Sequence, residues 1–422
     1  MFEKILLQRT DLPDSEKIDV YLAHGGYQAL SKALLQHKRE ELIEMVKKSG
    51  LRGRGGAGFP AGVKWGFMPR DPDVVKYVCV NTDEGEPGTF KDRVLVEKDP
   101  HQVIEGTIIA SYAVGAQRAF VYIRGEFFTG VKRWVKAIAD AYERGFLGKN
   151  ILDSGFSLDL SVHRGAGAYI CGEETALIES LEGKRGEPRL KPPYPAQRGL
   201  FGKPTLVHNV ETLCNVPHIV LRGPEWYASI GTPKSTGPKI FCVSGHVNRP
   251  GNYELPLGTP LREIIYEHAG GVKGGRAIKA VIPGGSSTPM LRPDQLDTPM
   301  DFESLAAAGS MLGTGAIIVI AEGTCMVDVA RRTARFFAHE SCGRCTPCRI
   351  GTQHLLETLE RIEAGKGQPG DIELLHSLCN GIQGNTFCPM GDAAVAPIRS
   401  SLSLFRDEYE AHIAQHRCPL AR

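Results

Sequence analysis

The stretch Tyr77-Val-Cys-Val80-Asn81-Thr-Asp83-Glu84-Gly-Glu86-Pro-Gly88 decides the fold class of this chain. Its first four residues form an apolar run that predicts a short strand, and the run leads directly into a loop with three carboxylates. In doubly wound sheets, ligands bind beyond the carboxyl ends of the strands. The stretch therefore predicts a parallel α/β sheet with a ligand site at its edge.

The loop carboxylates Asp83, Glu84 and Glu86 are suited to the hydroxyl groups of a sugar, because an ionised carboxylate only accepts hydrogen bonds. They would also repel a 2′-phosphate, which favours NADH over NADPH. A solvated acidic loop or a cation site is the alternative interpretation of the same residues.

The expected fold class is a multidomain α/β protein with four parts. Residues 1–62 are predicted to form a helical cap with a glycine-rich loop, and residues 63–230 a Rossmann-like domain in which strands and helices alternate. Residues 231–322 combine hairpin strands, a short helix and returning strands, which suggests a β-grasp domain. Helical periodicity predicts a helical bundle over residues 323–422, with a cysteine loop at one end.

Composition narrows the possible functions. Fifty lysines and arginines nearly cancel 48 aspartates and glutamates, so net charge gives no sign of nucleic-acid or membrane binding. Eleven cysteines without regular disulfide spacing favour a reducing compartment. The start of the sequence resembles no signal or transit peptide, and no stretch reaches the roughly 20 apolar residues of a spanning helix. We therefore expect a cytoplasmic protein that meets a membrane only through a partner.

A second candidate site is the glycine-rich loop Leu51-Arg-Gly-Arg-Gly-Gly-Ala-Gly-Phe-Pro60, which has G-x-G-x-x-G register. A Rossmann fingerprint requires a preceding strand, whereas a predicted helix that ends at Gly50 precedes this loop, so that interpretation fails. Residues without side chains still let backbone N–H groups approach a phosphate or a flat ring. Arg54 and Lys64 could neutralise a phosphate. The alternative is a flexible loop without a ligand.

The stretch Arg164-Gly-Ala-Gly-Ala-Tyr169-Ile-Cys-Gly172-Glu173-Glu174 also leads from glycines into a predicted helix. Glu173 and Glu174 fall in the first turn, where the helix dipole favours negative charge, so they could be helix-start acids without any further role. Tyr169 could border a flavin ring or be a core aromatic.

The cysteine pattern indicates a metal centre. Cys342, Cys345 and Cys348 have C-x-x-C-x-x-C spacing, and the distant Cys388 precedes a proline, as in bacterial ferredoxins. We expect an iron–sulfur cluster, with zinc or unligated thiols as alternatives. Cys379 is the rival for the fourth ligand, but no proline follows it. The remaining cysteines are expected to be buried small hydrophobes.

Together the motifs resemble the NADH-binding flavin subunit of bacterial respiratory complex I and its relatives, the diaphorase subunits of soluble NAD-linked hydrogenases and formate dehydrogenases. One departure is His208, where many relatives have asparagine, which puts its contact to the flavin phosphate in doubt. The motifs that carry the resemblance span nearly the whole chain: LRGRGGAGFPAGVKW (51–65), NTDEGEPGTFKDR (81–93), GAGAYICGEETAL (165–177), HNVETL (208–213), SCGRCTPCRIGT (341–352) and FCPMGDAA (387–394).

The resemblance implies three groups of ligand-binding residues. The four cysteines Cys342, Cys345, Cys348 and Cys388 would hold one 4Fe-4S cluster. Glu86 lies in the loop expected to meet the nicotinamide, so it is the candidate catalytic residue. The residues implied for FMN are Gly53, Arg54, Gly55, Gly56, Lys64, Asn81, Asp83, Glu84, Glu86, Gly172, Glu173, Glu174, Asn209 and Thr212. Those implied for NADH are Phe59, Phe67, Glu86, Tyr169, Glu174 and Tyr194.

The function implied by the resemblance is that of an NADH dehydrogenase, the electron-input subunit of an NADH:quinone oxidoreductase. Hydride would pass from NADH to FMN, and single electrons would pass through the cluster to partner subunits and toward quinone. The implied partners are a thioredoxin-like 2Fe-2S subunit and a large iron–sulfur subunit, on the cytoplasmic face of the bacterial inner membrane. A hydrogenase or formate dehydrogenase diaphorase is one alternative, and a non-enzymatic iron–sulfur scaffold is another.

Overall fold

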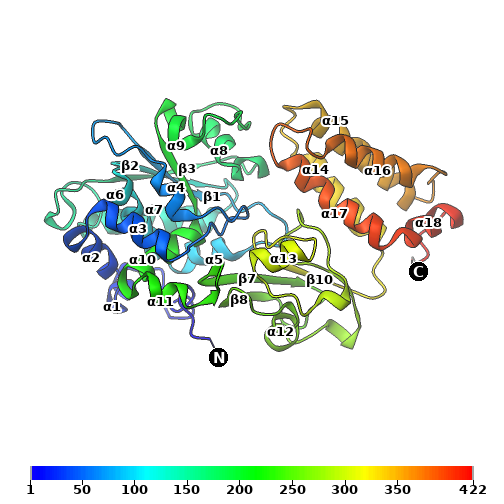
Figure 1. Ribbon diagram of the computed structural model, residues 1–422, viewed down its shortest axis with the longest axis horizontal. Coiled ribbons are helices and arrows are strands. Elements are labelled where there is room, and N and C mark those ends of the chain that lie inside the picture. The colour runs from blue at the N-terminus through cyan, green and yellow to red at the C-terminus, as the bar shows by residue number, and fades with distance from the viewer. Residues whose placement is uncertain (1, 421–422) are drawn as a thin grey trace.

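The computed structural model describes residues 2–420, which form two four-stranded sheets and a C-terminal group of helices (Figure 1). The first sheet has the order β3-β2-β1-β4, and all of its neighbouring strands are parallel. Its strands are β1 (Tyr77–Thr82), β2 (Arg118–Ile123), β3 (Asp159–Arg164) and β4 (Thr205–Asn209).

This sheet is buried on both faces, which explains why the first four residues of β1 form an apolar run. Val78 and Val80 pack into one hydrophobic core, and Cys79 packs into another on the opposite face, as the alternation of side chains along a strand requires. The long helices α6 (Pro100–Val114) and α10 (Val210–Arg222) supply much of the first core.

The strand order creates a switch point between β1 and β4. The chain passes from β1 to β2 on one side and later returns to β4 on the other side. Ligands in open α/β sheets bind at such a point, beyond the carboxyl ends of the strands. Asn81 near the end of β1 pairs in register with Asn209 at the end of β4, so these two residues mark the expected location.

The N-terminal helices pack against the same core as α6 and α10. The buried Glu105 of α6 accepts backbone hydrogen bonds from Tyr27 at 3.0 Å and Leu30 at 2.8 Å. The remaining helices of this half are α1 (Ile18–Ala23), α2 (Gln28–Gln36), α3 (Arg39–Lys48), α4 (Ala61–Gly66), α5 (Lys91–Lys98), α7 (Phe128–Glu143), α8 (Glu174–Leu181), α9 (Pro195–Arg198) and α11 (Pro224–Ala228).

The second sheet has the order β8-β7-β10-β9, with an antiparallel hairpin on one side and a parallel central pair. A short helix lies between the hairpin and the two later strands in sequence, which is the β-grasp arrangement that the sequence predicts. The bounds are β7 (Pro238–Gly245), β8 (Gly251–Pro256), α12 (Leu261–Glu263), β9 (Ile278–Ile282), α13 (Phe302–Ala307) and β10 (Ala316–Ala321). A two-residue hairpin, β5 (Gly231–Thr232) and β6 (Ser235–Thr236), precedes it.

The C-terminal helices pack side by side around their own core, at one end of the molecule (Figure 1). The cysteine loop joins the first two of them. Their bounds are α14 (Met326–Glu340), α15 (Thr346–Glu363), α16 (Asp371–Ile382), α17 (Met390–Leu404) and α18 (Arg406–Gln415).

The predicted α/β fold class is confirmed, as are the three strands expected near residues 77, 119 and 158. The sequence pattern missed β4, whose five residues lie directly before the long helix α10. The boundaries at residues 62, 230 and 322 stay predictions. Among residues 2–420, no helix combines the length and the apolar composition that a membrane crossing needs.

Candidate functional site

The glycine-rich loop lies directly above the end of β4. The backbone N–H of Arg54 donates to Thr212 Oγ1 at 2.8 Å. A Cβ at Gly55 would stand 3.0 Å from the Cβ of Asn209, so this close approach leaves little room for any side chain. Gly56 has a φ of +134° and no atom within 4 Å of where its Cβ would be, so the loop presents open backbone to one side.

The acidic loop and the Tyr169 turn meet at the end of β1. Asn81 Nδ2 donates to the carbonyl oxygen of Gly172 at 2.8 Å, and Asn81 Oδ1 accepts from the N–H of Asp83 at 3.0 Å. The hydroxyl of Tyr169 donates to Glu86 Oε2 at 2.7 Å. The structure therefore brings together the segments that the sequence singled out separately.

Lys64 connects this edge to α8. Its Nζ donates to Glu174 Oε2 at 2.7 Å and to the carbonyl of Val207 at 2.9 Å. Burial alone would raise the pKa of Glu174, but Lys64 and Lys191 together hold that pKa below its ordinary value. Glu174 is therefore a carboxylate at neutral pH. As predicted, Glu173 lies at the helix start, where its side chain accepts backbone hydrogen bonds from α8.

Three of the residues predicted to meet NADH are exposed aromatics. Phe59 is 48% exposed, Phe67 60% and Tyr194 56%. The ring centroids of Phe59 and Phe67 are 6.1 Å apart, with the rings tilted by 42°. Large apolar rings with this exposure are free to stack on a ligand.

The loop carboxylates already have partners in the protein. Asp83 pairs with Arg124 at 3.0 Å, and burial raises its pKa to about 7 although Arg124 acts against the shift. Glu84 accepts the N–H groups of Asp92 at 2.8 Å and Arg93 at 3.0 Å, at the start of α5. Their predicted role toward sugar hydroxyls stays a prediction.

Glu86 joins the acidic loop to the β-grasp domain. Besides the Tyr169 hydroxyl, its carboxylate accepts from the N–H of Ser287 at 2.7 Å and lies 3.2 Å from the Ser286 hydroxyl. The residue is 9% exposed. It is thus held at the boundary of two sheets, with its orientation fixed by three donors.

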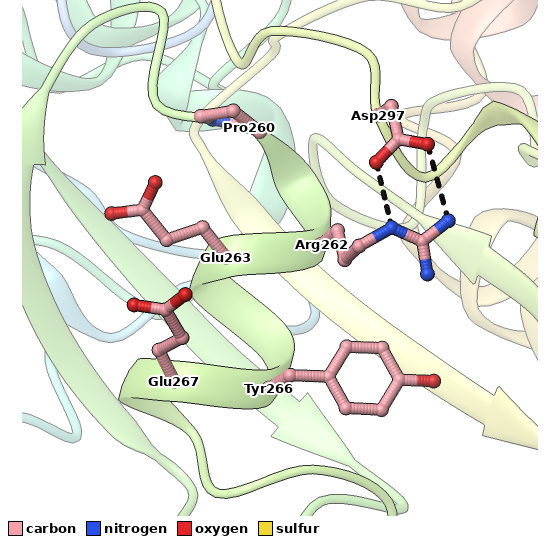
Figure 2. Close-up of a pocket in the computed structure, with 6 residues that line it drawn as sticks. All are labelled: Pro260, Arg262, Glu263, Tyr266, Glu267 and Asp297. Atoms are coloured by element: carbon pink, nitrogen blue, oxygen red, sulfur yellow. Dashed lines mark hydrogen bonds and ion pairs between the residues drawn. The ribbon is translucent and has the colours of Figure 1, made fainter.

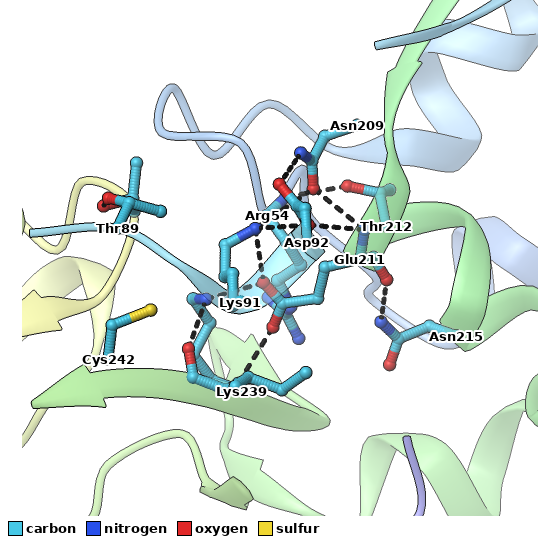
Figure 3. Close-up of polar contacts among 12 residues, drawn as sticks. Arg54, Thr89, Lys91, Asp92, Asn209, Glu211, Thr212, Asn215, Lys239 and Cys242 are labelled. Atoms are coloured by element: carbon cyan, nitrogen blue, oxygen red, sulfur yellow. Dashed lines mark hydrogen bonds and ion pairs between the residues drawn. The ribbon is translucent and has the colours of Figure 1, made fainter. Parts of the chain in front are cut away.

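A buried charge network under the glycine loop was missed by the sequence reasoning (Figure 3). Lys91 pairs with Asp92 at 2.8 Å and with Glu211 at 2.9 Å, and Lys239 pairs with Glu211 at 2.7 Å. All four side chains are at most 3% exposed. Asn209 donates to Asp92 at 2.7 Å, so the network fixes the end of β4. The adjacent charges Lys91 and Asp92 in one quoted motif, and Glu211 in another, were the available signal.

The Arg54 guanidinium has partners in the protein, and its predicted contact to a phosphate stays a prediction. This side chain is buried, and its Nη2 donates to the Tyr227 hydroxyl at 3.1 Å and to the carbonyl of Thr236 at 2.7 Å. Although burial opposes the charge of Glu211, Lys239, Lys91 and Arg54 together lower the pKa of Glu211. Arg54 therefore acts on the buried network, on the protein side of the loop.

His208 is engaged by the protein. Its Nε2 accepts a hydrogen bond from Trp65 Nε1 at 2.8 Å. Burial, with a smaller effect from Lys64, holds the pKa of His208 well below its ordinary value, so the ring is neutral. The contact of His208 to the flavin phosphate stays in doubt.

The four predicted metal-binding cysteines come together between α14, α15 and α17, in a hydrophobic cluster that also contains Tyr169 and Cys171. Phe387 N–H lies 3.5 Å from Cys345 Sγ. Among residues 2–420, no three of the four sulfur atoms lie within 4.8 Å of one another. A single zinc ion would require sulfurs about 3.8 Å apart, whereas the corners of an iron–sulfur cube are wider. Cys379 lies in the core of the helical bundle instead.

The cysteine loop and the Tyr169 turn are in contact. The N–H of Tyr169 donates to Glu340 Oε2 at 3.0 Å, and the rings of Tyr169 and Phe336 meet edge to face at 5.1 Å. Arg185 donates to the carbonyl of Cys342 at 2.7 Å. The turn that reaches Glu86 on one side therefore supports the cysteine loop on the other side.

A separate surface hollow lies on the β-grasp domain, around α12 (Figure 2). Its arginine, Arg262, is already paired with Asp297 at 2.6 Å. The other charged side chains that line it are Glu263 and Glu267. None of the predicted site residues belongs to this hollow.

Relatives with known names resemble the chain over nearly its full length. An F subunit of NADH-quinone oxidoreductase from Rhizobium meliloti, the one numbered 2, is 57% identical over 99% of this chain and 100% of that protein. The NADH-quinone oxidoreductase F subunit of Streptomyces coelicolor is 52% identical over 97% of this chain and 91% of that protein. The chain belongs to the family of NADH-quinone oxidoreductase F subunits.

Three domain families match parts of the chain. The Nuo51 FMN-binding domain matches residues 46–218, the SLBB domain residues 239–319, and the NADH-ubiquinone oxidoreductase-F iron-sulfur binding region residues 328–412. A chain in the crystal structure of an NAD+-reducing NiFe-hydrogenase in the H2-reduced state is 39% identical, with a TM-score of 0.84. The match covers 97% of this chain and 66% of that chain.

The residues fit the groups that the family descriptions name. The open backbone at Gly56 lies beside the ends of β1 and β4, where a phosphate could meet the N-terminus of α10. The exposed rings near Lys64 can border a flat cofactor. The cysteine spacing fits a 4Fe-4S cluster better than a single ion, for the reason of distance given above.

Proposed function

We propose that this chain is the NADH-oxidising subunit of an NADH-quinone oxidoreductase. The observation that carries the proposal is the Tyr169 turn, which contacts Glu86 at the end of β1 and also supports the cysteine loop. When bound, FMN accepts hydride from NADH and releases electrons one at a time, and a 4Fe-4S cluster carries them onward. The protein supplies position and electrostatics for this chemistry.

The flavin side of the site, residues 51–65, 81–93 and 208–213, would hold FMN. Backbone N–H groups of the glycine-rich loop and the start of α10 would bind its phosphate. The full set proposed to contact FMN through backbone or side chain is Gly53, Arg54, Gly55, Gly56, Lys64, Asn81, Asp83, Glu84, Glu86, Gly172, Glu173, Glu174, Asn209 and Thr212.

The exposed aromatics Phe59, Phe67 and Tyr194 would stack on the substrate NADH, near Tyr169 and Glu86. Glu174 carries a full negative charge, which would repel the 2′-phosphate of NADPH. Glu86 would orient the nicotinamide as a hydrogen-bond acceptor. No general base is needed, because hydride transfer releases no proton from a side chain.

The cluster side, residues 341–352 and 387–394, would hold the iron through Cys342, Cys345, Cys348 and Cys388. We propose the four predicted parts of the chain, divided at residues 62, 230 and 322, as its domains. The family matches at 46–218, 239–319 and 328–412 support that division, although the first match begins inside the proposed cap.

An electron-input chain of this kind works with partner subunits. We propose a thioredoxin-like 2Fe-2S subunit and a large iron–sulfur subunit as the next electron carriers, in a complex on the cytoplasmic face of the bacterial inner membrane. The second candidate is a diaphorase subunit of a soluble NAD-linked hydrogenase. The 39% identity to the hydrogenase chain favours this alternative, and the higher identity to F subunits of NADH-quinone oxidoreductases favours the first.

The test is anaerobic reduction of the purified full-length chain by NADH. The visible flavin absorbance should bleach with NADH and change far less with the same concentration of NADPH. Glu86→Gln should be reduced more slowly by NADH per bound FMN than the parent, with Glu97→Gln on α5 as a matched control. A preparation that neither retains nor rebinds flavin would favour the non-enzymatic scaffold.

A further inference from the structure

A second group of metal-type ligands lies in the helical bundle, away from the cluster cysteines. Cys325, Glu363, His412 and Cys418 each direct one ligand atom to a common point, and these atoms all lie within 4.8 Å of one another. We name these four residues the C-terminal ligand group. Cys325 precedes α14 whereas Cys342 follows it, so the 15 residues of α14 separate the two sites by about 22 Å.

The distances between the ligand atoms of this group match those around a tetrahedrally coordinated ion. Cys325 Sγ lies 3.3 Å from His412 Nε2 and 3.6 Å from the Glu363 carboxylate, and His412 Nε2 lies 3.3 Å from the same carboxylate. Four ligands around Zn2+ at bond lengths of about 2.0–2.3 Å stand about 3.3–3.8 Å apart. Cys325, His412 and Glu363 therefore have the separation that a zinc ion would impose, and Cys418 Sγ lies within 4.8 Å of each of their ligand atoms.

The surrounding contacts orient two of the ligands. His412 Nδ1 lies 2.6 Å from the carbonyl oxygen of Glu408, so Nδ1 carries the proton and Nε2 is free to bind a metal. A carbonyl in this position is the usual support of a metal-binding histidine. The N–H of Asp328 donates to Cys325 Sγ at 3.3 Å, which orients this sulfur at the start of α14.

We propose that the C-terminal ligand group is a structural site for Zn2+. Two sulfurs, one nitrogen and one carboxylate oxygen form a closed set of four protein ligands, which is typical of structural zinc rather than catalytic zinc. The ion would join the start of α14, the end of α15, α18 and the segment after α18. It would fix the C-terminal segment to the connection between the β-grasp domain and the helical bundle.

The decisive measurement is zinc K-edge X-ray absorption on the full-length chain, purified with FMN and its iron–sulfur cluster. Elemental analysis should find about one zinc per chain. The spectrum should show two sulfur neighbours at about 2.3 Å and two nitrogen or oxygen neighbours at about 2.0 Å. Zinc with four sulfur neighbours would mean that the cluster cysteines had been filled with the wrong metal, and it would overturn the proposal.

A pair of variants links the ion to this group. Cys418→Ser should lose the zinc and keep the iron and FMN of the parent, because the cluster cysteines are untouched. Cys379→Ala, a thiol loss in the same bundle, should keep all three. Absence of zinc from the parent, or a Cys325–Cys418 disulfide found by mass spectrometry in its place, would overturn the proposal. If Cys418→Ser does not fold, the spectrum of the parent decides alone.

Discussion

Buried charges on the flavin side of the site satisfy one another, whereas the four thiols of the cluster side have few partners in the protein. Lys91, Asp92, Glu211 and Lys239 form a closed set of ion pairs between 2.7 and 2.9 Å. The cluster cysteines are instead lined mainly by apolar neighbours. The flavin side is preorganised for its ligand, whereas the cluster side needs iron to satisfy its thiols.

This difference has a consequence for assembly. A site with paired charges can keep its shape without FMN, because no buried ion is left without a partner. Thiols in an apolar pocket gain their strongest interactions only when a metal binds, so metal binding contributes to folding there. We expect loss of iron to loosen the helical bundle and to leave the sheet intact.

The largest expected effect comes from removing one cluster thiol. Cys345→Ala should lose the whole cluster, about four iron atoms per chain, and all electron delivery to partner subunits. FMN content and part of the NADH–ferricyanide activity should remain, because the flavin side is formed by other residues. Iron analysis measures the cluster content and flavin absorbance measures the FMN content, with Cys379→Ala as the control. Complete loss of flavin in Cys345→Ala would contradict the independence of the two sides.

The next largest effect is on stability and comes from the flavin side. Glu211→Ala leaves Lys91 and Lys239 buried without their shared carboxylate. This should lower the free energy of unfolding by about 3–5 kcal/mol. Glu44→Ala removes an exposed pair with Lys47 and should cost about 0–1 kcal/mol. Urea unfolding of both variants gives the comparison. Equal midpoints would show that the buried network contributes no more than a surface pair.

Local patterns were enough to predict the sheet strands with apolar runs, and the cysteine spacing was enough to predict the metal centre. Tyr77–Val80 is apolar because both faces of β1 are covered, so the sequence records its burial directly. The triple cysteine spacing fits one short loop, which lies between two helices as expected. In both cases the signal lies within a few neighbouring residues.

The rest depends on contacts between distant segments. The partners of Arg54 are Tyr227 and Thr236, and no local pattern says that this arginine is buried. Cys325 and Cys418 were expected to be buried hydrophobes, because each is isolated in the sequence. Only folding brings them to one point with His412.

A smaller effect is expected from pH on the flavin side. Burial raises the pKa of Asp83 to about 7, above the value of about 3.9 in an unfolded chain. Its contribution to stability is therefore fully present below about pH 3.9 and is lost as the pH rises through about 7. Between about pH 6 and pH 8 the titration of Asp83 should lower the free energy of unfolding by about 1.4 kcal/mol.

Asp83→Asn should remove that part of the pH dependence. The measurement is the unfolding free energy of Asp83→Asn and of the parent at about pH 6 and pH 8. Asp11→Asn is the control, because this carboxylate is exposed. Both variants leave the other buried acids, such as Glu254, unchanged. A pH dependence in Asp83→Asn as steep as that of the parent would place the titration elsewhere.

The smallest expected effect concerns the choice of nucleotide. Glu174 is held in its charged form by Lys64 and Lys191 despite its burial, so its removal should weaken the repulsion of a 2′-phosphate. One such charge across a partly wet site is worth about 1 kcal/mol, which is roughly a fivefold change in the ratio of kcat/KM for NADH and NADPH. Glu174→Ala should show this change, and Glu179→Ala on the same helix should not. A change of this ratio in both variants would point to the general negative potential of α8. A change in neither variant would exclude Glu174 from the nucleotide site and leave the acidic loop as the source of the discrimination.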